Sequence, residues 1–201
     1  MEKLVVKTAV KTVLILLGVA VVAFAVVNFA FPQYMATVSE SMGNYDLAVK
    51  YASLRYRYTR NCDDLARCFD DGVLSGNDKY VLQFGEQLIE HRDYAEVCRE
   101  KDHKQTGSGY SYNHWVQARL AIAYYNTDQK AKAIDMAAED NGTESFVYGN
   151  PLMSLVAYIR SGNDKEAAKY ILTKLNAIHP ADAKEQGYLT EAVTAMNSVK
   201  G

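Results

Sequence analysis

The stretch VLILLGVAVVAFAVVNFAF, from Val13 to Phe31, decides how the rest of this chain of 201 residues is organised. Its nineteen residues include no charged side chain, and Asn28 is the only strongly polar one. At about 1.5 Å of rise per residue, a helix of this length covers about 28 Å, which matches the hydrocarbon thickness of a bilayer. The stretch predicts a membrane-spanning helix at 13–31, after a short cytoplasmic N-terminus at 1–12.

Charges differ on the two sides of this stretch. Three lysines lie within the first eleven residues, whereas the first acidic residue after the stretch is Glu40 and the first cation is Lys50. Because positively charged flanks stay in the cytoplasm, we expect a single-pass cell-membrane protein with an extracytoplasmic C-terminal domain. A cleaved signal peptide is the alternative, since Ala23 and Ala25 form an A-x-A pattern, although the stretch is longer than a usual h-region.

The remainder of the chain, residues 33–201, is long enough for one hydrophobic core or one short repeat array. From Glu40 onward there are 19 Lys and Arg residues against 23 Asp and Glu, so this part is mildly acidic. It has no basic stripe to neutralise phosphates, which disfavours a nucleic-acid partner. The fifteen tyrosines recur within helical patterns, and we expect most of them to be packing residues with a hydrated hydroxyl.

Apolar residues recur at spacings of three and four in every long segment after Pro32, and no segment alternates with a period of two for long. This pattern predicts an all-α domain. Pro32 ends the apolar stretch, Pro151 follows the capping residue Asn150 at a helix start, and Pro180 closes another helix.

Four short segments resemble one another: MGNYDLAVKYA at 42–52, SGNDKYVLQFG at 75–85, YNTDQKAKAID at 125–135 and SGNDKEAAKYI at 161–171. Each is typical of a helix end, a turn and a helix start. We expect left-handed backbone at the Gly or Asn of positions 43, 76, 126 and 162, with an acidic residue near the start of the next helix. The first two turns are 33 residues apart and the last two 36, a period typical of helix-turn-helix solenoids.

These units resemble the tetratricopeptide repeat family. The matching positions are Trp115, Asn126, Ala131 and Ala138 in the third unit and Tyr158, Gly162, Ala167, Ile171 and Pro180 in the fourth. The resemblance implies about four antiparallel helix pairs in a domain over 33–201, which we expect to hold about nine helices. Where the family has a small residue in the first helix, Ala36 agrees, and the later units have Phe69, Arg119 and Leu155.

Two segments fall outside the units. About 16 extra residues, at 93–109, separate the second and third units. Their first part, 93–104, can form a short charged helix, and 105–109 is a loop that we expect to be the most mobile internal segment. The insertion is either a partner-facing appendage or a plain surface excursion. After Pro180 an apolar stripe predicts a capping helix at about 187–199, with Gly187 favouring a separate turn at 181–186.

No arrangement of side chains in the sequence predicts catalysis. The histidines form no HExxH pair, and His91-Arg92-Asp93 lacks the other parts of a kinase site. Asp63-Asp64 and Asp70-Asp71 are seven apart on one helix, but no calcium loop accompanies them. The three cysteines form no metal-binding pair, and both a disulfide to Cys98 and buried free thiols remain open. We therefore expect no enzyme activity, no cofactor and no metal site.

Two functions remain open. The first is a membrane-anchored, outward-facing scaffold or adaptor that binds protein partners, as an ancillary subunit of a membrane or envelope complex. The second is a secreted or anchored small-ligand-binding protein or hydrolase with a Tyr-containing groove. The tetratricopeptide resemblance implies a groove along the first helices of successive pairs, and the matching residues are Asp63, Asp70, Asn113, Tyr124, Leu152, Val156 and Arg160.

With Arg160 as its one cation, this groove suits an extended or helical segment with apolar and basic residues. Tyr124 is the expected anchor of the partner because aromatic side chains dominate interface energetics. Packing of Tyr124 between helix pairs is the alternative. The resemblance places Tyr158 at a packing position between helices.

Overall fold

The computed structural model describes residues 2–104, 111–139 and 150–200, and every regular element in these ranges is an α-helix. The predicted all-α class is therefore confirmed for the described residues. The helices are α1 (Glu2–Ala30), α2 (Pro32–Ser41), α3 (Tyr45–Thr59), α4 (Cys62–Leu74), α5 (Asp78–Ile89), α6 (Tyr94–Lys104), α7 (Tyr112–Asn126), α8 (Lys130–Glu139), α9 (Pro151–Gly162), α10 (Lys165–Leu175) and α11 (Ala183–Lys200).

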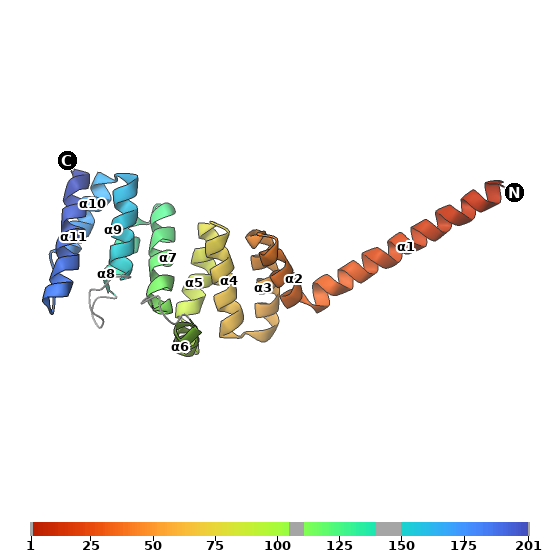
Figure 1. Cartoon of the computed structure of the whole chain (residues 1–201), viewed down its shortest axis with the longest axis horizontal. Helices are drawn as coiled ribbons and strands as arrows, with labels where there is room; N and C mark the ends of the chain where they lie inside the picture. The colour runs from red at the N-terminus through yellow and green to blue at the C-terminus, as the bar shows by residue number, and fades with distance from the viewer. Residues whose placement is uncertain (1, 105–110, 140–149, 201) are drawn as a thin grey trace.

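The helices after α1 lie side by side in one row, with the two termini at opposite ends of the molecule (Figure 1). Consecutive helices pack as pairs, α2 with α3, α4 with α5, α7 with α8 and α9 with α10, and α11 covers the last pair. This order is consistent with a helical repeat. The described residues after α1 form ten helices where about nine were expected, because α6 is added to four pairs and a terminal helix.

Helix α1 projects from the row (Figure 1). Within it, Val10–Val27 is long and apolar enough to cross a membrane, and none of it is buried against the rest of the structure. A membrane anchor and an N-terminal signal sequence both fit this description. The helix ends at Ala30, and Pro32 then occupies the first turn of α2, where its missing N–H costs no hydrogen bond.

Left-handed residues close the turns between paired helices. Gly43 (φ 70°) and Gly76 (φ 69°) have this conformation, as predicted. In the third and fourth turns the prediction of positions 126 and 162 is wrong: the left-handed residues are Asp128 (φ 65°) and Asn163 (φ 52°), because α7 and α9 continue through the expected positions. Asp and Asn tolerate this region because their short polar side chains bond locally.

Helix α11 begins at Ala183, so the predicted separate turn at 181–186 is wrong. The side chain of Asp182 accepts hydrogen bonds from the N–H groups of Lys184 and Glu185, and the Glu185 carboxylate accepts one from the N–H of Ala181. This reciprocal cap starts the helix before Gly187, which lies inside it with open space around it.

The hydrophobic core extends along the row as two clusters that meet at α7. Leu120 of α7 belongs to the cluster that packs α2 to α7, and its neighbour Ala121 belongs to the cluster that packs α7 to α11. Each helix pair therefore buries its apolar side chains against the next pair, as in stacked repeats.

A glycine accommodates one departure from the small-residue pattern. Phe69 of α4 is fully buried, with its ring edge-to-face on Trp115 at a centroid distance of 5.4 Å. A Cβ atom at Gly85 of α5 would lie 2.8 Å from Phe69 Cε2 and 2.6 Å from Leu120 Cδ2, closer than side chains approach. The missing side chain at position 85 thus leaves room for the ring, and α4 and α5 remain in contact.

Candidate functional site

The seven residues predicted to line a groove lie in different environments. Tyr124, Leu152 and Val156 are buried in the core where α7, α8, α9 and α10 meet, so they present no open surface in this structure. Asp63 and Arg160 are exposed, and Asp70 and Asn113 are half-buried.

Tyr124 and Tyr158 both contact neighbouring helices, at different depths. Tyr124 is 4% exposed; its hydroxyl donates to Glu86, and the Lys132 ammonium lies 4.0 Å from its ring centroid. Packing between helix pairs, the alternative for this residue, describes these surroundings. Tyr158 is 37% exposed, and its hydroxyl donates to Asn126 Oδ1 at 2.8 Å. Its ring also lies edge-to-face on Tyr125 of α7 at a centroid distance of 5.8 Å. Tyr158 therefore lies between α9 and α7, as the resemblance implies, at the rim of the contact.

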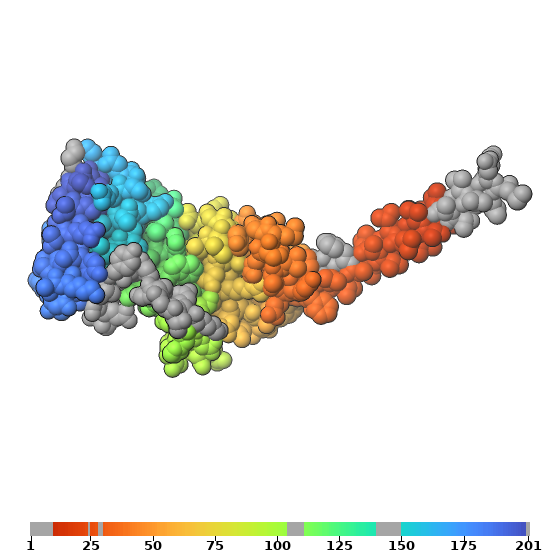
Figure 2. All heavy atoms as spheres, in the orientation of Figure 1, coloured from red at the N-terminus to blue at the C-terminus, as the bar shows by residue number. Residues whose placement is uncertain are grey.

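Helix α6 lies against α4 and α7, two first helices of successive pairs. It forms a projection at the lower side of the row in Figure 2. Lys101 of α6 pairs with Asp70 of α4, and Tyr94 of α6 donates a 2.9 Å hydrogen bond to Asn113 of α7. Two of the predicted groove residues are thus engaged by a segment of the same chain.

The same contacts define the insertion at 93–109. The predicted short charged helix is confirmed as α6, whereas the predicted loop at 105–109 lies outside the described residues. Asp102 of α6 accepts a 2.6 Å hydrogen bond from the backbone N–H of Tyr112, the first residue of α7. Polar contacts from three residues of α6 therefore fix its position on the stack.

A recurring set of three side chains explains part of the tyrosine content. In each set, a Tyr hydroxyl donates to a carboxylate, a Lys pairs with the same carboxylate, and the Lys ammonium lies over the Tyr ring. Within the described ranges these Tyr–acid–Lys sets are Tyr112–Asp70–Lys101, Tyr124–Glu86–Lys132, Tyr125–Asp164–Lys130 and Tyr170–Asp135–Lys174.

The sets link helices that are distant in sequence. Each tyrosine is 35 to 42 residues from its carboxylate, about one repeat period, and the ammonium-to-centroid distances run from 4.0 to 5.4 Å. A cation over an aromatic face and a charge-assisted hydrogen bond each add to packing. The sequence contains the tyrosines and the acids, but no local spacing indicates which of them meet.

The electrostatics of the sets built on Asp164 and Asp135 indicate structural links. The donors Lys130 and Tyr125 hold the pKa of Asp164 well below its usual range, and Lys174 and Tyr170 lower that of Asp135. Burial and the nearby carboxylate raise the pKa of the Tyr125 phenol. These carboxylates are therefore charged and this phenol is neutral at physiological pH, which suits binding more than proton transfer.

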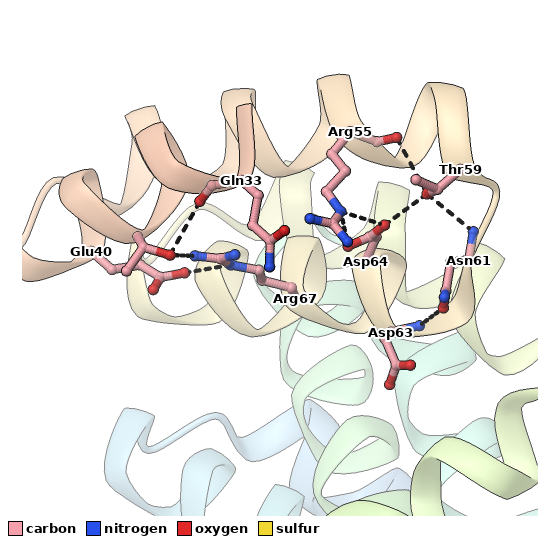
Figure 3. A network of polar contacts seen from close by, with 9 residues as sticks. Gln33, Glu40, Arg55, Thr59, Asn61, Asp63, Asp64 and Arg67 are labelled. Atoms are coloured by element: carbon pink, nitrogen blue, oxygen red, sulfur yellow. Dashed lines mark hydrogen bonds and ion pairs between the residues drawn. The ribbon is translucent and has the colours of Figure 1, made fainter. Parts of the chain in front are cut away.

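A second polar network joins the first three helices of the stack (Figure 3). Arg67 of α4 donates to Glu40 of α2 at 2.7 Å. Arg55 of α3 pairs with Asp64 of α4 at 2.8 Å, and the Thr59 hydroxyl donates to the same carboxylate at 2.7 Å. Since α2 and α3 form the first pair and α4 begins the second, these bonds hold the first pair against the second.

Asp71 is buried beside this network. Burial and the nearby Glu40 carboxyl raise the pKa of Asp71 to about 7, although the Arg67 guanidinium opposes the shift. The Asp71 and Glu40 carboxyl groups therefore share a proton near neutral pH. Among the described residues, Asp71 Oδ2 is buried without a hydrogen-bond partner.

The cysteines are free and buried. Burial raises the pKa of Cys62 to about 11 and that of Cys68 to about 12, so both thiols are protonated at neutral pH. Of the two alternatives left by the sequence, the structure has free thiols. Among the described residues, no group of three or more His, Cys, Asp or Glu side chains could hold a metal ion.

A hollow of about 610 Å³ lies where α1, α2 and α3 meet. Three aromatic side chains at this end of the stack are strongly exposed: Phe31 (58%), Tyr34 (63%) and Tyr58 (81%). Sequence reasoning missed this surface, and the available signal was the aromatic residues next to the apolar stretch. The hollow is lined by Ala30, Phe31, Pro32, Gln33, Tyr34, Thr37, Arg55, Tyr58 and Thr59.

Comparison of the chain with protein-family models, with curated proteins and with solved structures finds no match.

Proposed function

We propose that this protein is a membrane-anchored scaffold, with α1 spanning a bilayer and the helix stack binding a protein partner on the outward side. The uncovered apolar surface of Val10–Val27 supports the anchor, because exposure of so many apolar side chains to water is unfavourable. The lysines at 3, 7 and 11 precede it, which favours a cytoplasmic N-terminus.

We assign the stack to the tetratricopeptide type of helical repeat. Four sequential helix pairs with similar turns support this assignment, as does α11, which covers the open end of the last pair. The room that Gly85 leaves for Phe69 accounts for one departure from the family pattern. This assignment favours a binding role over a catalytic one.

The observation that carries the proposed binding role is the position of α6. A short helix lies on two first helices, and its basic Lys101 reaches the acidic Asp70. The face that holds α6 therefore has the chemistry to receive a helical segment with basic residues. Asp63, which is exposed on α4, and Arg160, which is exposed on α9, are the predicted groove residues that remain open to a partner.

Capture from detergent-solubilised membranes tests this role, with mass spectrometry to identify retained proteins. Asp63→Arg and Arg160→Glu reverse two charges on first helices and should abolish capture of the partner. Lys169→Glu reverses an exposed charge on α10, a second helix, and should leave capture intact. Equal capture by all variants, or capture of no protein by the wild type, contradicts the proposed surface.

A separate experiment tests the topology. Protease added to intact cells or spheroplasts should degrade the stack, and alkaline carbonate should leave the chain in the membrane fraction. Protection of the stack, or its release without α1, rules out the outward-facing anchor.

A further inference from the structure

Exposed aromatic residues cluster at the end of the stack next to α1. Phe31 directly follows α1, Tyr34 lies in the first turn of α2, and Tyr58 lies in the last turn of α3. All three are more than half exposed, and all three line the hollow. Aromatic rings in such a position, next to an apolar helix, are typical of the membrane–water interface.

Cations accompany these rings. The run RYRYTR at 55–60 contains Arg55, Arg57 and Arg60, and the last two are exposed. The Arg55 guanidinium is engaged by Asp64, so Arg57 and Arg60 supply the open positive charge, with Asp63 as the exposed acid at the start of α4.

The acids of the first helix pair lie at its other end. Glu40 is in the last turn of α2 and Asp46 in the first turn of α3, on either side of the Gly43 turn. The pair therefore presents its positive, aromatic end beside α1 and its acidic residues away from α1.

We infer that this end of the first pair, comprising Phe31, Tyr34, Arg57, Tyr58 and Arg60, is a lipid-contact surface that rests on the bilayer and binds the phosphate groups of anionic phospholipids. The inference rests on the proposed anchor: where α1 spans the bilayer, Phe31 and Tyr34 emerge at headgroup depth. Arginine binds phosphate through several donors, and tyrosine tolerates an environment that is apolar at one end and wet at the other. The contact would set the orientation of the stack relative to the membrane.

Quenching by brominated lipids tests this contact in the full chain, reconstituted in phosphatidylcholine vesicles with or without phosphatidylglycerol. Tyr58→Trp places an indole in the surface, and Thr194→Trp places one on an exposed site of α11 as the control. The native Trp115, in the middle of the stack, is the background in both variants. We expect quenching for Tyr58→Trp and none beyond background for Thr194→Trp.

The outcomes separate the contact from the anchor. A chain that resists carbonate extraction, yet shows no more quenching for Tyr58→Trp than for Thr194→Trp, overturns the lipid contact and leaves the anchor intact. A chain that carbonate extracts overturns the anchor itself, and the contact with it.

Charge variants test the phosphate binding. In the Tyr58→Trp background, we combine Arg57→Gln with Arg60→Gln. In the anionic vesicles, each substitution should lower the ratio of molecules whose stack contacts the bilayer to those whose stack does not by about fivefold. Quenching should then fall to its level in phosphatidylcholine alone. Lys50→Gln, an exposed site nearer the other end of α3, should change nothing. Quenching that is the same with and without the two arginines, and with and without phosphatidylglycerol, overturns the assignment to anionic phosphate.

Discussion

Tyr125 of α7 donates a 2.5 Å hydrogen bond to Oδ2 of Asp164, the residue that caps α10. The same carboxylate binds Lys130 at 2.7 Å and accepts hydrogen bonds from the N–H groups of Glu166 and Ala167. One side chain therefore caps the second helix of the fourth pair and fastens it to the third pair.

Substitutions at this link should differ in cost. Tyr125→Phe removes one hydrogen bond and should lower the free energy of unfolding by about 1 kcal/mol. Asp164→Ala also removes the cap and should cost roughly 1 kcal/mol more. Urea denaturation of the full chain in mild detergent, followed by circular dichroism, measures both. Tyr34→Phe, at an exposed ring, is the control and should be neutral. Equal stability of all three variants would show that the Tyr125–Asp164 contact does not stabilise the fold.

The carboxyl pair of Asp71 and Glu40 should make stability depend on pH. The pKa of Asp71 is about 7 in the folded chain and about 3.9 for an unperturbed Asp. The folded state thus binds the proton more tightly, so this contribution is fully present below about pH 4 and is lost as the pH rises through about 7. This contribution should lower the melting temperature between about pH 4 and about pH 7.

Asp71→Asn should flatten that profile, because its amide can donate to Glu40 at every pH. Asp63→Asn, at an exposed site on the same helix, should keep the wild-type slope. Thermal melting across the pH range provides the comparison. Parallel profiles for the wild type and Asp71→Asn would show that another group is responsible.

Two glycines in helices should respond oppositely to alanine. Gly85→Ala forces a Cβ into Leu120 and Phe69, both fully buried, and should cost about 1–3 kcal/mol despite the better helix propensity of alanine. Gly162→Ala adds a methyl group where no atom lies within 4 Å and should be neutral or stabilising by up to about 1 kcal/mol. Denaturation midpoints of the two variants and the wild type measure both effects. A Gly85→Ala protein as stable as the wild type would mean that α4, α5 and α7 pack less closely than described.

Tyr124 and Tyr158, which lie at different depths between helices, give a further test. Tyr124→Ala empties a site in the core and should cost about 3–5 kcal/mol, as large aromatic deletions do. Tyr158→Ala removes a partly exposed ring, its edge contact with Tyr125 and one hydrogen bond, and should cost about 1–2 kcal/mol. Melting of the two variants under one condition measures the difference, and a larger loss for Tyr158→Ala would contradict the deeper burial of Tyr124.

The sequence by itself determined the helical class, the apolar N-terminal helix, the short charged helix of the insertion and the first two turns. These features depend on charge, on periodicity and on capping within a few residues, so the local pattern is sufficient. Asn150–Pro151 marks a helix start for the same reason.

Only the tertiary structure decided which side chains are open. Tyr124 and Tyr158 both occupy repeat positions, but the register of α7, α8 and α9 buries the first and leaves the second at the rim of the α7–α9 contact. The structure also placed α6 on two first helices and paired Tyr125 with Asp164, 39 residues away. Such contacts depend on how one helix pair seats on the next, a relationship that the spacing of residues within a single pair does not contain.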